Sequence, residues 1–334
     1  MLTACLLALH VPGLLADALD ADALDRLAER AMTTFDVPGM AIGVVKDGSV
    51  VYAKGHGVRE RGRDGAVDTD TLFKIASNSK AFTAAALAIL GDEGRIEWHG
   101  AVSDYIPEFR TTEPWVTAHL SVVDLLTHRA GLVAHAGDLL LWPDPNEFTR
   151  RDVIHALRYF PLVSDFRDSY NYDNVLYIVA GEIVPRITGQ GFEAFVEARI
   201  MRPLGMDRCF MGAIPKAELR NLAAPHGMID GELQVIERSR IHGEPALYAA
   251  AGGVVCSLDD MLDWVQLQLG RGTSPEGVQI FSAARSREMW RPENSWGVSL
   301  RNYEWHRSHF NGYGLGWRLS DVHGFLEVSH TGSL

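Results

Sequence analysis

The sequence predicts an α/β (α+β) fold in which an antiparallel sheet is flanked by helices and joined to a mostly helical second domain. Residues 22–35 carry apolar side chains at helical spacing. The apolar runs 40–45 and 50–53 flank an Asp-Gly turn, which is the strongest short signal of a β-hairpin. Residues 314–319 and 325–329 are typical of strands. Strands are therefore expected at both ends of the chain, with helices between them.

The middle of the chain contains the helical patterns. We expect helices over 77–91 or 77–94, from 121 onward, and over 150–159, 174–188, 192–201 and 257–269. No repeat or long linker interrupts them. This pattern predicts a sheet domain built from residues 22–75 and 250–334, and a mostly helical domain over 76–249.

Composition excludes several functions. Of 334 residues, 47% are apolar and 22% are charged, an ordinary globular balance. The net charge of −12 repels a phosphate backbone, so we expect no nucleic-acid partner. No run of eighteen apolar residues follows the first few, so no membrane span is expected in the body. Three cysteines are too few for a disulfide scaffold, and Cys209 with Cys256 is the one pair left if Cys5 is removed with a leader.

The N-terminal residues predict export. Residues 1–16 are mostly apolar, and alanines that suit cleavage follow near 16–18. We therefore expect a signal segment over 1–18 and a periplasmic or extracellular bacterial location. The segment lacks a basic start, so a short buried helix is the alternative; residues 2–5 also resemble a lipobox.

Ser77 and Lys80 form the first candidate for chemistry. Residues three apart share one face of a helix, so the two side chains can meet. A serine hydroxyl needs a nearby base to act as a nucleophile, and a lysine serves if burial removes its proton. Taken alone the pattern is weak, because an N-cap serine beside a solvated lysine is the commoner arrangement.

Two further groups lie far along the chain. Tyr172 can relay a proton beside a cation, and Asn174 can hold an amide-like substrate. His330, Thr331 and Gly332 follow an apolar run, and the glycine permits a substrate to approach the strand backbone. A core tyrosine beside a capping asparagine, and a strand that ends in a turn, are the structural alternatives.

The three groups together resemble the signature of β-lactamases and penicillin-binding proteins. The branch that is similar contains class C β-lactamases, DD-carboxypeptidases, D-aminopeptidases and esterases, in which the middle motif is Tyr-x-Asn and His-x-Gly often replaces Lys-Thr-Gly. The resemblance covers about residues 22–334. Further similar segments appear in the same order: FKIASNSKAFTA (73–84), LLTHRAGL (125–132), PLGM (203–206), AGGV (251–254) and YGLGW (313–317).

The resemblance implies a β-lactamase/transpeptidase-like fold with the active site between the two domains, and a serine hydrolase. Ser77 is expected to attack an ester or amide carbonyl and form an acyl-enzyme. Lys80 and Tyr172 are expected to share the acid and base work, and which of them takes the first proton stays open. His330 is expected to orient Tyr172 and the carboxylate of a substrate.

The same resemblance implies how substrate is held. Asn174, Thr331 and Gly332 are expected to bind it, and the backbone N–H groups of Ser77 and Ser333 are expected to form the oxyanion hole. The partner is a small molecule or peptide with an ester or amide bond; no metal or organic cofactor is implied. A histidine in place of lysine recognises a carboxylate more weakly, which favours an esterase or peptidase over a true β-lactamase.

One departure from the family pattern concerns the C-terminal end. In the family, two more strands and a helix follow the His-Thr-Gly strand, whereas here the sequence stops at Leu334. We expect the last strands and the C-terminal helix to be lacking, as in a fragment of a longer protein. The alternative function is a non-catalytic or truncated family member that acts as a binding protein.

Overall fold

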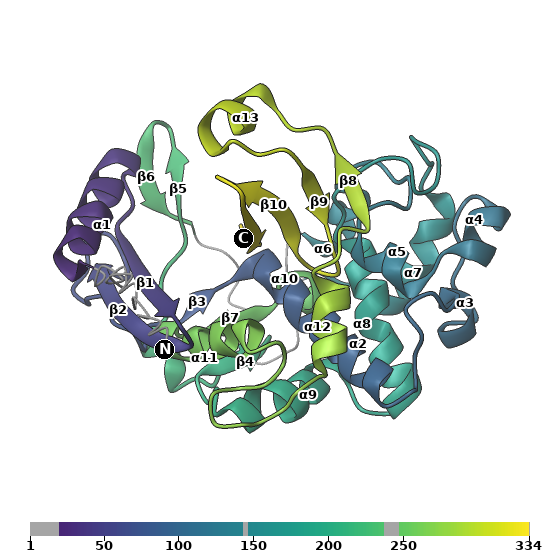
Figure 1. Ribbon diagram of the computed structural model, residues 1–334, viewed down its shortest axis with the longest axis horizontal. Helices are drawn as coiled ribbons and strands as arrows, with labels where there is room; N and C mark the ends of the chain where they lie inside the picture. Colours follow the sequence, from purple (N-terminus) through teal and green to yellow (C-terminus); the bar gives the residue numbers. More distant parts are fainter. Residues whose placement is uncertain (1–19, 143–145, 237–246, 334) are drawn as a thin grey trace, which may run out of the picture.

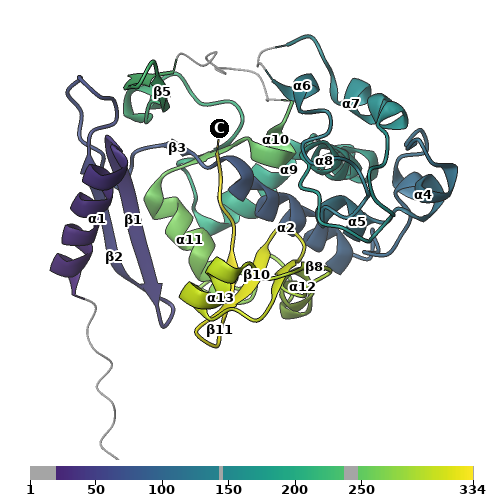
Figure 2. The same cartoon turned by 90° about the horizontal axis from the view of Figure 1, so that it is seen from above.

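A computed structural model describes residues 20–142, 146–236 and 247–333. It is a mixed α/β structure with small antiparallel sheets and many helices, which confirms the predicted fold class. Helix α1 (Ala21–Phe35) and the hairpin of β1 (Gly39–Lys46) and β2 (Ser49–Gly57) lie at one end of the molecule. Helices α4 (Pro114–His119) and α7 (Arg150–Ala156) lie at the other end in both views (Figures 1 and 2). The predicted signal segment lies outside the described residues, and no helix within them is long and apolar enough to cross a bilayer.

The N-terminal elements form as the sequence predicts. The side chain of Asp20 caps α1 by accepting a backbone N–H of its first turn. The β1–β2 turn pairs Lys46 with Ser49, and its central residues Asp47 and Gly48 have φ of 52° and 78°. Positive φ at both positions is what a type I′ hairpin turn requires, and Asp-Gly supplies it.

The helical region is built around a buried helix, α2. Its residues from Ser79 to Gly91 are all buried, and they pack on α8, α10 and α12. The predicted helices form as η1 (Ala76–Asn78) with α2 (Ser79–Asp92), α5 (Val122–Leu126), α7 (Arg150–Ala156) with η2 (Leu157–Tyr159), α8 (Val175–Thr188), and α9 (Phe192–Val196) with η3 (Glu197–Met201). The same region also contains short helices that the sequence patterns did not predict: α3 (Val102–Tyr105), α4 (Pro114–His119), α6 (Asp138–Leu141) and η4 (Arg202–Leu204). Ser121 and Asp124 form the predicted capping box before α5.

The remaining strands form small sheets. Besides the β1–β2 hairpin, the strands of the described residues form three sheets, in the orders β3-β7-β4, β5-β6 and β11-β10-β9-β8. All of these pairs are antiparallel. The elements are β3 (Phe73–Lys74), β4 (Cys209–Met211), η5 (Glu218–Asn221), β5 (His226–Ile229), β6 (Glu232–Val235), α10 (Ala249–Gly252), β7 (Val254–Cys256), α11 (Leu258–Leu269), α12 (Ala283–Met289), β8 (Asn294–Trp296), α13 (Leu300–His306), β9 (Asn311–Tyr313), β10 (Arg318–Val322) and β11 (Phe325–Ser329).

One strand prediction is wrong at its start. The sequence predicts a strand over 314–319, but β10 begins at Arg318, and Gly314 donates its N–H to the carbonyl of Trp317 in a turn. Gly316 has φ of 82°, and a Cβ there would lie 2.8 Å from the carbonyl oxygen of Lys80. The segment turns because it packs directly on the first turn of α2.

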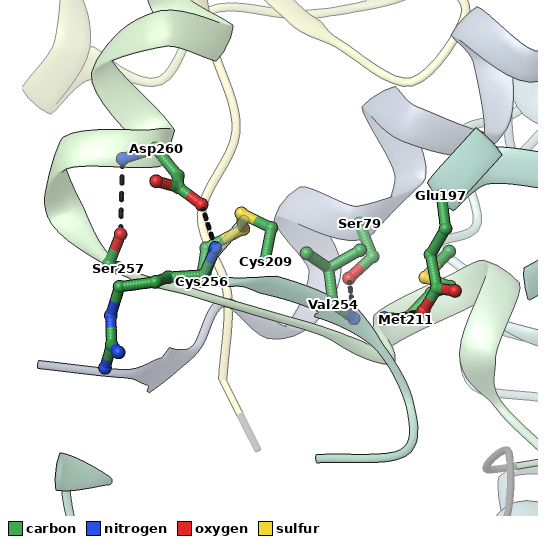
Figure 3. The surroundings of a disulfide bond; sticks show 9 residues. Ser79, Glu197, Cys209, Met211, Val254, Cys256, Ser257 and Asp260 are labelled. Carbon is green, nitrogen blue, oxygen red and sulfur yellow. Dashed lines mark hydrogen bonds between the residues drawn. A yellow bond between two sulfur atoms is a disulfide. The ribbon is translucent and has the colours of Figure 1, made fainter. Parts of the chain in front are cut away.

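A disulfide between Cys209 and Cys256 joins β4 to β7 (Figure 3). The two cysteines are direct cross-strand partners, and both are buried. The other end of β7 is tied to α2, because Val254 donates its N–H to Ser79 Oγ at 2.9 Å. Strand β7 therefore links the sheet to α2, which carries Lys80 and directly follows the turn of Ser77.

Candidate active site

Ser77 lies on the 3₁₀ turn that precedes α2. Ala76, directly before it, is buried and has φ of 50°, a left-handed conformation that costs a non-glycine residue roughly 1–2 kcal/mol. Such strain persists only where the surrounding structure holds it, and it is concentrated at functional sites. The turn leaves the half-buried Ser77 hydroxyl 3.1 Å from Lys80 Nζ.

The amine of Lys80 is fully buried and hydrogen-bonded on three sides. Besides Ser77 Oγ, it contacts Asn174 Oδ1 at 2.8 Å and the backbone carbonyl of Ala251 at 2.8 Å. Asn174 precedes α8, and Ala251 belongs to α10. Three segments that lie far apart in the sequence thus meet at one nitrogen atom. The spacing of Ser77 and Lys80 led us to expect their contact, whereas Asn174, which the resemblance assigns to substrate binding, here also contacts Lys80.

Burial lowers the pKa of the Lys80 amine to about 7, although the charges of Asp173 and Asp138 partly oppose this shift. A group with that pKa is about half unprotonated at neutral pH. Carboxamide and backbone oxygens can only accept hydrogen bonds. In the neutral amine the two N–H groups therefore go to Asn174 and Ala251, and the free electron pair faces Ser77.

Tyr172 also lies beside Ser77, and its phenol forms a hydrogen bond with the serine side chain. Burial raises the pKa of its phenol, and a hydrogen bond with Ser77 only partly offsets that effect. The Lys80 ammonium lies 4.8 Å from the centre of the Tyr172 ring. Tyr172 is consequently protonated at neutral pH, and it can give a proton but is a poor acceptor of one.

His330 is engaged at both ring nitrogens. Nδ1 lies 2.6 Å from the Thr331 carbonyl, which can only accept, so Nδ1 donates. In the neutral ring Nε2 then accepts from the hydroxyl of Tyr313 at 2.7 Å. Burial lowers the pKa of His330 to about 3, so the ring is neutral at pH 7. The centres of the His330 and Tyr172 rings are 6.4 Å apart.

The segment after His330 lies against the turn that carries Ser77. A Cβ on Gly332 would approach the carbonyl oxygen of Ile75 to 2.3 Å, so only glycine fits there. Thr331, Gly332 and Ser333 are all exposed. The close contact at Gly332 brings the exposed backbone of this segment next to the serine.

Two residues beside the site were not among the candidate site residues: Asp138, which had no sequence signal, and His128, which lies in the family-like segment 125–132. Asp138 accepts hydrogen bonds from the Asn174 amide at 3.0 and 3.3 Å. The ring of His128 packs 4.3 Å from that of Tyr172 and accepts the backbone N–H of Asp173 at 3.2 Å. These contacts depend on tertiary packing, and no spacing rule links the residues. No cluster of metal-binding side chains occurs within the described ranges.

A model of the Beta-lactamase family matches residues 24–334. An unguisins hydrolase of Aspergillus campestris is 27% identical over 92% of this chain and 58% of its own length, and penicillin-binding protein 4 of Amycolatopsis lactamdurans is 27% identical over 90% and 76%. The chain spans about half the length of the fungal relatives.

A solved structure gives the same fold. The octameric penicillin-binding protein homologue from Pyrococcus abyssi superposes with a TM-score of 0.77 and 24% identity, covering 94% of this chain and 68% of that one. The family match extends over nearly the whole chain, and the chain therefore belongs to the β-lactamase family.

Proposed function

We propose that this protein is a serine acyl hydrolase that cleaves an ester or amide through an acyl-enzyme on Ser77. One observation carries the proposal: the buried Lys80 amine lies 3.1 Å from the Ser77 hydroxyl, and acceptor-only oxygens occupy its other two positions. A neutral amine held in this way is a general base directed at one hydroxyl.

The protonation states of Lys80 and Tyr172 support the following steps. Lys80 takes the proton of Ser77 as the serine oxygen bonds to the substrate carbonyl carbon. Tyr172, which is protonated at neutral pH, gives its proton to the leaving oxygen or nitrogen and regains one from the Lys80 ammonium. Water then attacks the acyl carbon, and Ser77 recovers its proton.

We also propose that the backbone N–H groups of Ser77 and Ser333 stabilise the oxyanion, and that Thr331 and Gly332 line the substrate. The tight contact of Gly332 with Ile75 supports this placement. Loss of one such donor typically raises the activation free energy of the reaction by about 3–4 kcal/mol. Because His330 is neutral, it offers no charge to a substrate carboxylate, which favours an ester or peptide-like amide over a β-lactam.

The disulfide supports the proposal of an exported protein. Disulfides form and persist in the periplasm and outside the cell, and they are rare in the reducing cytosol. The Cys209–Cys256 bond is buried between two strands, so it serves the structure.

Labelling with a fluorophosphonate, followed by intact mass, tests the proposed nucleophile. We expect one adduct on the parent and none on Ser77→Ala. Ser79→Ala is the matched control, because Ser79 lies two residues away and its hydroxyl accepts the N–H of Val254. That variant should lose stability, about 1–3 kcal/mol for an unsatisfied buried group, and keep its label. A parent that takes no label contradicts the proposal and favours a non-catalytic binding protein.

A further inference from the structure

Asp138 is the first residue of α6 and lies behind Asn174, on the side away from Lys80. Both of its carboxylate oxygens accept from the Asn174 NH₂ group, at 3.0 and 3.3 Å. The imidazole of His135 contacts one of these oxygens at 3.1 Å. The carboxylate is only 24% exposed, so these partners define its position.

The carboxylate decides which end of the Asn174 amide faces the lysine. An ionised carboxylate can only accept, so it binds the NH₂ end and turns Oδ1 toward Lys80 Nζ at 2.8 Å. If the amide were reversed, its NH₂ group would face the amine. It would then repel the ammonium form, or donate to the electron pair of the neutral form and so withdraw that pair from Ser77.

We propose that Asp138 is a positioning residue, which holds the Asn174 amide in one orientation and thereby directs the free electron pair of Lys80 at Ser77. The inference rests on the proposed function of Ser77 and names a further determinant of it. Within the described part of the chain Asp138 makes no hydrogen bond to Ser77 or to the Lys80 amine, so it acts through Asn174.

The negative charge of Asp138 adds a second, separable effect. It favours the ammonium form of Lys80 and so raises the pKa of the amine, against the larger effect of burial. The titratable and charged groups that face this lysine are Asp138 from α6, Asp173 and Tyr172 from the segment before α8, Tyr177 from α8, His128 from the segment after α5, and His330 after β11. Removal of the Asp138 charge therefore lets Lys80 lose its proton at a lower pH.

The test is the rate of fluorophosphonate labelling of Ser77 as a function of pH. Asp138→Ala removes both the orientation and the charge, so we expect the plateau rate at high pH to fall at least about ten-fold, a part of the 10²–10⁴ that general-base catalysis contributes. The midpoint should move to lower pH. Asp138→Asn removes the charge and keeps an oxygen acceptor, so its midpoint should move while its plateau falls less.

Two controls separate positioning from simple loss of structure. Asp165→Asn, an exposed carboxylate on a neighbouring loop, should leave both plateau and midpoint unchanged. In an Asn174→Ala background, Asp138→Ala should no longer lower the plateau, because the amide on which it acts is absent. Damage to the fold would lower the plateau in both backgrounds and would not move the midpoint.

The outcomes are distinguishable. A parent that is not labelled at Ser77 overturns the proposed function, and this inference with it. A parent that is labelled, with an Asp138→Ala plateau within two-fold of its own, overturns the inference alone. An equal fall with and without Asn174 also overturns it, because Asp138 would then act by another route.

Discussion

At the residue scale, the proposed role of Lys80 as a base depends on the burial of its amine. An exposed lysine keeps its proton well above neutral pH and cannot serve as a base. Lys80 lies in α2, and its amine contacts Asn174, at the start of α8, and Ala251 in α10. Among the described residues, the negative charges that act on it are those of Asp173, next to Asn174 in sequence, and of Asp138, which binds the Asn174 amide. Burial outweighs these charges, because the two carboxylates only partly offset the loss of hydration.

The pKa of Lys80 predicts a pH profile for the parent. The base acts when unprotonated, so labelling of Ser77 should rise with pH, reach half its maximum near pH 7 and level off about one unit higher. The rate should be measured from pH 5.5 to 9.5 with a fluorophosphonate in excess. Lys80→Met should give a low rate without this rise. A parent profile that rises only above pH 9 would point to Tyr172 as the base and contradict the assignment.

At the scale of elements, the active site is assembled by close backbone contacts. The 314–317 turn packs on the carbonyl of Lys80 through Gly316, and the segment after β11 packs on Ile75 through Gly332. Both contacts position the C-terminal sheet against the first turns of α2. Neither leaves room for a side chain, so these glycines set the distance between the sheet and the proposed nucleophile, Ser77.

A comparison of Gly316 with Gly324 tests the contact between Gly316 and the Lys80 carbonyl. Both have left-handed φ, 82° and 86°, but a Cβ on Gly316 would meet the Lys80 carbonyl at 2.8 Å, whereas one on Gly324 meets nothing within 4 Å. Gly324→Ala should cost about 1–2 kcal/mol of unfolding free energy from backbone strain alone, with normal labelling. Gly316→Ala should cost more and also slow labelling. Urea unfolding and labelling rates measure both effects; equal rates in the two variants would contradict this account.

At the scale of the whole molecule, periodicity and motif spacing predicted most of the fold. The spacing of apolar residues in α1, the Asp-Gly turn of the hairpin and the start of α5 at Ser121 are local sequence patterns. The structure contains the element that each of them predicts. Ser77 and Lys80 were found because their spacing on one helix face is also local. Asn174 was singled out as a substrate-binding candidate, but no local rule could place it at the Lys80 nitrogen.

The features that sequence could not supply are those created by packing. The Ala251 carbonyl beside Lys80 belongs to the backbone, so no side-chain pattern marks it. Asp138 reaches Asn174 across 36 positions of sequence. The strand pattern over 314–319 was overridden at Gly316 by contact with α2. In each case a tertiary contact outweighs a local preference, and only the assembled molecule shows it.

The hydrophobic core is continuous through α2, α8, α10 and α11, so the helical region and the residues after 249 share one interior. The disulfide between Cys209 and Cys256 adds a covalent link across it, with a sequence separation of 47 residues. Closing a loop of that length in the unfolded chain is worth about 4 kcal/mol in the chain-entropy account, and natural disulfides typically contribute about 2–4 kcal/mol.

Replacement of both cysteines by alanine should therefore lower the free energy of unfolding by about 2–4 kcal/mol. Alanine leaves no unsatisfied hydroxyl between β4 and β7, so the change reports mainly the lost link. Urea unfolding followed by circular dichroism, with and without a reductant, measures the effect. Reductant should shift the parent to lower urea and leave the double variant where it is. Coincident curves for the oxidised parent and the variant would show that packing around Val254 and Ser79, rather than the sulfur bridge, holds β7 against α2.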